Sequence, residues 1–161
     1  MDIRSKRSVS NRLGDDVPIY TDHPIVGTWR LLSFTNADTA TGAVIHPLGE
    51  KPNAIVIYSA DGYAATIFTS AHRIVPIAAQ ASDEEAIKLY RSMIAFAGRY
   101  HLDRDRLIYH PEISWNEMWN GTTQERLFEI TADRLHVQSL PSMNPSSGAK
   151  TVFSLVWERA R

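Results

Sequence analysis

Residues 99–140 carry the stretch that decides the fold, RYHLDRDRLIYHPEISWNEMWNGTTQERLFEITADRLHVQSL. Runs rich in β-branched and aromatic residues alternate in it with short turn signals at 103–106, 120–121 and 131–134. Asn120-Gly121 is the strongest signal, because a type I′ turn needs positive φ at both central positions. Short turns make neighbouring strands antiparallel, so this stretch predicts a meander of β-hairpins.

The same alternation continues toward both ends of the chain. The predicted strands are Val26–Thr35, Ala43–His46, Ala54–Ser59, Tyr63–Thr69, Arg99–Asp103, Arg106–Asn116, Thr123–Thr131, Arg134–Leu140 and Thr151–Arg159. About nine short strands at this spacing are typical of an all-β sandwich or barrel. The sequence therefore predicts an antiparallel all-β fold that is mostly a meander.

One helix is expected near residues 82–97. Ser82 and Glu85 form a capping-box pattern at its start, and Gly98 ends the helical periodicity. Apolar residues recur at helical spacing: Ala86, Tyr90, Met93, Ile94 and Ala97. Two interpretations stay open, because this apolar face could pack against the strands or could close a ligand cavity as a lid.

Composition excludes several classes of protein. The chain has 161 residues, 43% of them hydrophobic, and no cysteine, so a disulfide scaffold, a thiolate zinc site and a cysteine nucleophile are excluded. Lys and Arg number 17 against 18 Asp and Glu, which argues against a nucleic-acid partner. No apolar run approaches the ~18 residues of a membrane span, so no membrane partner is expected.

The first 22 residues show no periodic pattern and are expected to form a flexible tail, with Ile19 and Tyr20 docking on the body. Residues 23–161 then form a single domain. The basic start of the chain is not followed by the apolar segment of a secretory signal, so a cytoplasmic location is expected.

A two-residue turn at Asn120-Gly121 would place Glu117 opposite Gln124 and Trp115 opposite Arg126. The turns at 103–106 and 131–134 similarly pair strands across each hairpin. One face of the predicted sheet then collects Tyr100, Leu102, Leu107, Tyr109, Ile113, Trp115, Phe128, Ile130, Leu135 and Val137. The other face collects Arg99, His101, His110, Glu112, Glu125, Glu129, His136 and Gln138. The apolar face is the interior, although a single β-bulge would reverse part of the assignment.

Four polar residues fall on the predicted inner face near one end: Glu117, Gln124, Arg126 and Ser139. Two interpretations remain open. Glu117 and Arg126 could pair and close the end of the barrel, since buried charges need partners. Alternatively, these groups could hold a ligand at the end of an apolar cavity, where an arginine would suit a carboxylate, enolate or phenolate.

The candidate site residues follow from this register. The candidates for acid–base chemistry are Glu117, Arg126, Tyr109 and His110. The candidates for ligand binding are Tyr58, Tyr100, Tyr109, Trp115, Gln124, Arg126 and Phe128. No helical zinc motif, glycine-rich phosphate loop or dinucleotide fingerprint occurs, so no metal and no cofactor are expected.

Four motifs in order along the chain carry a family resemblance: Gly27-Thr28-Trp29, Ile57-Tyr58-Ser59-Ala60-Asp61-Gly62-Tyr63, Trp119-Asn120-Gly121-Thr122-Thr123-Gln124 with Arg126, and Leu155-Val156-Trp157-Glu158-Arg159. Together they resemble the bacterial and fungal lipocalin-like domain family. The resemblance implies a barrel of about eight to ten strands around a cavity, with Trp29 packed under Arg159 at the closed end. Tyr109 and Glu117 stand where many relatives have histidine and proline.

Three functions follow as alternatives. The first is an intracellular barrel that binds a small, largely apolar ligand. The second is a cofactor-independent isomerase, cyclase or lyase (a dehydratase, for example) of secondary metabolism, which needs an enclosed proton donor and acceptor. The third is a structural barrel with a filled interior. Leu127 and Met118, expected on the outer face, are compatible with a homodimer.

Overall fold

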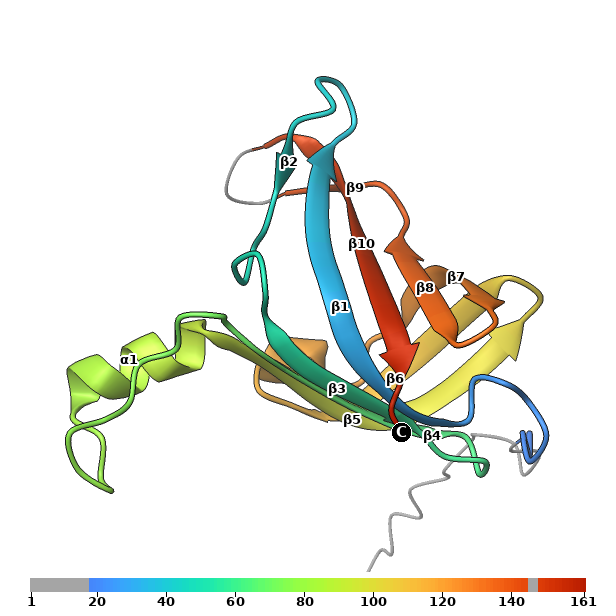
Figure 1. Ribbon diagram of the computed structural model, residues 1–161, viewed down its shortest axis with the longest axis horizontal. Coiled ribbons are helices and arrows are strands. Elements are labelled where there is room, and N and C mark those ends of the chain that lie inside the picture. Colours follow the sequence, from blue (N-terminus) through green and yellow to red (C-terminus); the bar gives the residue numbers. More distant parts are fainter. Residues whose placement is uncertain (1–17, 145–147) are drawn as a thin grey trace, which may run out of the picture.

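The computed structural model describes residues 18–144 and 148–161, so most of the predicted tail lies outside the described residues. In the described part, eight antiparallel strands close into a barrel (Figure 1). In order around the barrel they are β1 (Gly27–Asp38), β3 (Asn53–Tyr58), β4 (Tyr63–Thr69), β5 (Met93–Asp103), β6 (Arg106–Ser114), β7 (Gln124–Thr131), β8 (Arg134–Ser139) and β10 (Lys150–Arg159). Two short strands add to it: β2 (Val44–Ile45) pairs with β1, and β9 (Ser142–Met143) pairs with β10. The predicted all-β antiparallel barrel is confirmed.

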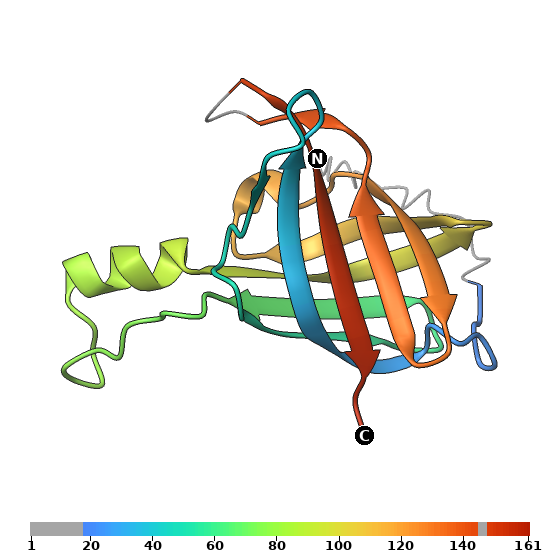
Figure 2. The same ribbon diagram turned by 45° about the horizontal axis from the view of Figure 1, so that its top comes forward.

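The two ends of the barrel are built differently (Figure 2). At one end, here called the closed end, tight turns join β3 to β4, β5 to β6 and β7 to β8. Residues 18–26 run across this same end. At the other end, here called the loop end, the connections are longer, including the one between β4 and β5 that carries the helix α1 (Asp83–Arg91).

Trp29 and Arg159 organise the closed end, as the resemblance implied. Trp29 is fully buried, and its indole N–H donates to the carbonyl of Ile25 at 2.8 Å. The Arg159 guanidinium lies 4.2 Å from the centre of the Trp29 ring and donates to the carbonyls of Val26 and Pro24. The last strand thus fastens the segment that precedes the first strand.

Tyr20 attaches the N-terminal segment to the closed end. Its backbone N–H donates to the carbonyl of Ala60 at 2.7 Å, and its ring stacks on Tyr100 at 5.1 Å. Its hydroxyl accepts a hydrogen bond from the backbone N–H of Leu102. The predicted docking of Tyr20 is confirmed, whereas that of Ile19 is wrong, since Ile19 is 76% exposed.

The helix α1 is shorter than predicted. Its capping box at Ser82 and Glu85 is present, but the helix ends at Arg91 and residues 93–97 begin β5. The apolar residues there alternate as in a strand, and Ile94 and Phe96 pack against the core. The helix projects away from the barrel with no buried residue and does not cover the interior (Figures 1 and 2). Its one ring contact in the described residues is between Tyr90 and Trp115, with their centres 6.1 Å apart. No helix in the described residues is long and apolar enough to span a membrane.

A β-bulge at Glu112 changes which side chains of β6 face inward. Pro111 pairs with Gly98 and is fully buried, but Ile113 beyond the bulge is 73% exposed, so its predicted inward position is wrong. Gly98 lies within β5, so the prediction that it ends a helix is wrong. The bulge explains why a glycine is needed there. A Cβ atom at that position would lie 2.1 Å from the carbonyl oxygen of His110. Only glycine allows the two backbones to approach this closely.

The predicted register between β6 and β7 is also wrong. Gln124 pairs with Tyr109 and Arg126 with Leu107, eight positions earlier in the chain than the predicted Glu117 and Trp115. The turn does join Trp119 to Thr122 by a 3.1 Å hydrogen bond. However, Asn120 has φ −61° and only Gly121 is positive, as in a type II turn, which does not match the twist of a two-residue hairpin.

The inward-facing side chains of β7 were nevertheless predicted correctly. Side chains alternate between faces with a period of two, and a slip of eight positions is even. The other two hairpins have the predicted register, with Tyr100 opposite Tyr109 and Phe128 opposite Val137. Gln124 and Arg126 therefore still face the interior.

Candidate functional site

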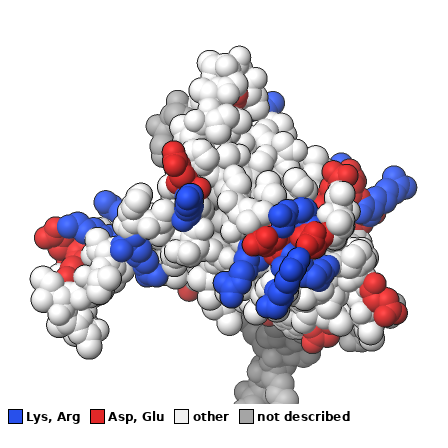
Figure 3. Space-filling view, in the orientation of Figure 1, with Lys and Arg blue, Asp and Glu red and all other residues white. Residues whose placement is uncertain are grey.

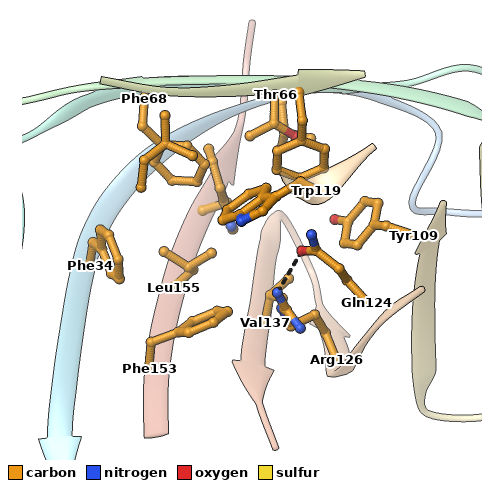
Figure 4. A pocket seen from close by; sticks show the side chains of 14 residues that line it. Phe34, Thr66, Phe68, Tyr109, Trp119, Gln124, Arg126, Val137, Phe153 and Leu155 are labelled. Carbon is orange, nitrogen blue, oxygen red and sulfur yellow. Dashed lines mark hydrogen bonds between the residues drawn. The ribbon is translucent and has the colours of Figure 1, made fainter. Parts of the chain in front are cut away.

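The interior holds a cavity of about 80 Å³, to which every barrel strand contributes (Figure 4). Its lining is almost entirely apolar and is rich in aromatic rings. The lining residues are Phe34, Val56, Thr66, Phe68, Ile94, Phe96, Tyr109, Trp119, Gln124, Arg126, Val137, Phe153, Leu155 and Trp157. An apolar wall with a few polar groups is the usual composition of a small-molecule site.

Arg126 is the one charged group among the described residues that line this cavity. Its guanidinium donates to the backbone carbonyl of Glu125 at 2.7 Å and to the side-chain oxygen of Gln124 at 3.0 Å. One face of the guanidinium lies over the ring of Phe153, 4.8 Å from its centre. Burial lowers the pKa of Arg126, and neighbouring Tyr109 partly opposes this shift. The guanidinium remains cationic at neutral pH.

Two tyrosine hydroxyls meet at the boundary between the cavity and the closed end. Tyr109 lines the cavity, and its hydroxyl is hydrogen-bonded to that of Tyr58, which is fully buried behind it. Burial raises the pKa of Tyr109 to about 12, although its hydrogen bond to Tyr58 and the nearby Arg126 favour ionisation. Burial also raises the pKa of Tyr58 well above its usual value. Both hydroxyls are therefore neutral at physiological pH.

Two further polar atoms in the cavity wall have no hydrogen-bond partner among the described residues. They are the hydroxyl oxygen of Thr66 and the indole nitrogen of Trp157. Both side chains are about 2% exposed, so bulk water does not reach them freely. A buried polar atom without a partner is costly, which marks these two positions as places where a bound molecule would form hydrogen bonds.

The structure places three of the seven predicted ligand-binding residues in the cavity wall and four outside it. Tyr109, Gln124 and Arg126 line the cavity. Tyr58 and Tyr100 are buried behind the cavity wall, where the Tyr100 hydroxyl donates to the carbonyl of Ser59.

Trp115 and Phe128 were also predicted to line the cavity, and neither does. Trp115 packs edge-on against Trp119, with their ring centres 4.8 Å apart, so it supports a lining residue from behind. Phe128 packs against the core nearer the closed end, beside His23. The position of Trp115 follows from the β6–β7 connection, because β6 ends at Ser114 and Trp115 lies beyond it.

Glu117 does not face the interior. It lies in a single turn of 3₁₀ helix, η1 (Glu117–Trp119), and is exposed. Its carboxylate accepts a hydrogen bond from the side chain of Asn120 at 2.8 Å. The predicted Glu117–Arg126 pair is therefore wrong, because the chain between Ser114 and Gln124 is a loop and not two paired strands.

His110 lies on the outer face, as the register predicted. Its ring is 5.3 Å from that of His101, and its Nδ1 is 3.3 Å from the hydroxyl of Thr123. Burial lowers the pKa of His101, and electrostatic interaction with His110 and Arg99 lowers it further. In the described residues, no three His, Asp or Glu side chains gather as a metal site. His110 therefore cannot reach a molecule inside the barrel in this arrangement.

Charged side chains of both signs intermingle on the outer surface (Figure 3). Arg134 and Glu158 form an ion pair at 3.0 Å across neighbouring strands, and Arg106 pairs with Glu125. This mixed surface contrasts with the interior, where Arg126 is the only charge on the described cavity wall.

Sequence reasoning missed most of the apolar wall. Alternation in β4 and β10 already indicated it, since Thr66 and Phe68, and likewise Phe153, Leu155 and Trp157, are spaced two apart. Trp119 gave no such signal, because it lies in η1, outside any strand.

A closed eight-stranded barrel around an apolar cavity defines a class of small, calycin-type β-barrels. Within this class, the chain belongs to the lipocalin-like domain family, whose model matches residues 26–160. A search of curated proteins gave no match.

Proposed function

We propose that the protein binds a small, largely apolar molecule inside the barrel. The observation that carries this proposal is the cavity itself, whose wall is aromatic and aliphatic on nearly all sides. Transfer of apolar surface from water into such a site is favourable by roughly 25 cal/mol per Å². A barrel of eight strands has room for one small ligand.

Titration with N-phenyl-1-naphthylamine, a neutral dye that fluoresces in apolar surroundings, tests the proposal. Saturable binding at one site per chain is expected. Leu155→Trp should abolish it by filling the cavity, since Leu155 lines the wall and is only 8% exposed. The matched control is Leu32→Trp, at a position that is 42% exposed.

Circular dichroism shows whether the Leu155→Trp variant folds, and Val137→Phe is a second filling variant in the same wall. Absence of saturable dye binding by the wild-type protein would contradict the proposal. So would equal binding by folded filling variants and by Leu32→Trp.

Acid–base catalysis in the same cavity, by an isomerase, cyclase or lyase, is the second candidate function. The Tyr58–Tyr109 hydroxyl pair favours it, because Tyr109 reaches the cavity as a neutral proton donor beside the Arg126 cation. The described cavity wall includes no carboxylate or imidazole, so the proton acceptor would have to be the substrate or water.

Deuterium uptake from D₂O by 2-tetralone, an enolisable ketone, tests this second function. Faster uptake with the wild-type protein than with Tyr109→Phe or Arg126→Gln is the expected result. Equal rates for all three proteins would rule out a role of these two residues in proton transfer.

A further inference from the structure

The polar groups of the cavity wall are mostly hydrogen-bond donors. Arg126 donates only, and so does the indole N–H of Trp157. The carbonyl oxygen of Gln124 accepts one hydrogen bond from Arg126, and both N–H groups of its amide are further donors. A molecule that forms hydrogen bonds with these donors must therefore supply acceptor atoms.

Arg126 keeps unused donors. A guanidinium has five N–H groups in one plane. The bonds to the Glu125 carbonyl and to Gln124 use two of these, and the Phe153 ring covers a face of the plane without using any. Within residues 18–144 and 148–161, three N–H groups are left without a partner, more than the two that a carboxylate engages in a bidentate pair.

Arg126 also has no counter-ion in the described part of the chain. The outer arginines 99, 106 and 134 each lie near a glutamate, whereas the partners of Arg126 are neutral. The Arg126 side chain is only partly exposed, and this burial lowers its pKa. A buried charge without an opposite charge is unfavourable, and an anion bound beside it would remove this cost.

We propose that the ligand of this cavity carries a carboxylate on an apolar body, with the carboxylate on the free edge of Arg126 and the apolar body against the aromatic wall. This inference rests on the proposed binding function and names its ligand class. Gln124 positions the guanidinium by accepting one of its hydrogen bonds, and Phe153 supports the guanidinium face. The assignment makes Arg126 the residue that selects an acid over its neutral analogue.

Displacement of bound N-phenyl-1-naphthylamine by a matched pair of competitors tests the inference. The pair is 4-phenylbutyrate and 4-phenylbutan-1-ol, which share a body and differ in the charged group. The wild-type protein should release the dye at an at least about tenfold lower concentration of the acid, the size of one charge-assisted hydrogen bond. Arg126→Gln should remove this preference, so that the acid and the alcohol compete at similar concentrations in the variant.

Arg134→Gln is the control variant, because Arg134 lies outside the barrel in an ion pair with Glu158 and should leave the preference intact. Arg126→Lys should keep part of it, since lysine retains the charge but not the planar edge. Equal competition by acid and alcohol in the wild type, or a preference that persists in Arg126→Gln, overturns the inference while the proposed function stands. No displacement by the acid overturns it equally. Failure of the dye itself to bind contradicts the proposed function instead.

Discussion

Arg159 and Arg126 each lie against an aromatic ring, one at the closed end of the barrel and the other in the cavity. Arg159 lies 4.2 Å from the centre of Trp29 and donates to two backbone carbonyls that fasten the start of the chain. Arg126 lies 4.8 Å from the centre of the Phe153 ring and keeps N–H donors that no other described residue accepts. The same pairing of residue types thus fastens two segments of the chain in one place, and in the other it leaves N–H donors without partners among the described residues.

The largest difference should come from removing one tryptophan at each end. Trp29→Ala should lower the free energy of unfolding by about 3–5 kcal/mol, because it deletes a fully buried indole. Trp119→Ala should cost only about 1–2 kcal/mol, because Trp119 is partly exposed, but it should weaken dye binding. Urea denaturation measures the first effect and dye titration the second. Similar stability losses would break the comparison.

The tyrosine pair between the two ends predicts a loss of stability at high pH. The pKa of Tyr109 is about 12 in the folded protein, against about 10 in an unfolded chain. Its contribution is fully present below pH 10 and is lost as the pH rises toward 12, because only the unfolded chain ionises in that window. The ionisation of Tyr109 alone should lower the free energy of unfolding by about 2–3 kcal/mol over these two pH units.

Denaturation at a series of pH values measures this loss, and Tyr109→Phe is the matched control. The variant should lose less stability than the wild type between pH 10 and 12. Identical pH profiles for the two proteins would show that Tyr109 ionises as readily in the barrel as in the unfolded chain.

Replacing Arg159 or Arg126 by methionine should change the free energy of unfolding by smaller amounts, and in different directions. Arg159→Met should destabilise the protein by about 1–3 kcal/mol, since it breaks hydrogen bonds made by a charged group to the carbonyls of Val26 and Pro24. Arg126→Met should be neutral or stabilising by about 1 kcal/mol, because it removes a buried charge that has no counter-ion in the described residues. Equal destabilisation by both substitutions, measured by urea denaturation, would contradict the proposed difference.

The smallest effect concerns a turn at the closed end. Ala132 has φ +53° in the tight turn between β7 and β8, a conformation that favours glycine. Ala132→Gly should raise the free energy of unfolding by about 0.5–1 kcal/mol. Ala65→Gly, at an exposed position within β4, should lower it by about the same amount. A destabilised Ala132→Gly protein would show that the turn is not strained.

The parts of the fold that the sequence predicted are those governed by local alternation. Tyr63–Thr69 was predicted with the bounds that β4 has, and both tight hairpins have the predicted register. The errors arose where tertiary packing overrides a local signal. Residues 93–97 continue a helical periodicity, yet they pair as a strand between β4 and β6, and the bulge at Glu112 depends on the approach of Gly98.

The candidate site divides in the same way. The inward direction of Arg126 and Gln124 followed from alternation, which survives a register slip of eight positions. Alternation could not predict the partner of Arg126, because that partner depends on which residues the β6–β7 connection brings near the guanidinium. That connection turns Glu117 outward, so the cavity contains a cation without the carboxylate that the sequence suggested.

The placement of the described chain ends has a practical consequence. Tyr20 is attached to the closed end through Ala60, and Arg159 through Asp133, so the two termini of the barrel leave it from the same side (Figure 2). A linker between them could make a circularly permuted chain, opened at the exposed segment around Val75 and Ile77 without cutting a barrel strand. A protein fused after Arg161 would likewise leave the barrel beside the β7–β8 turn of the closed end, where the backbone N–H of Arg159 donates to the carbonyl of Asp133.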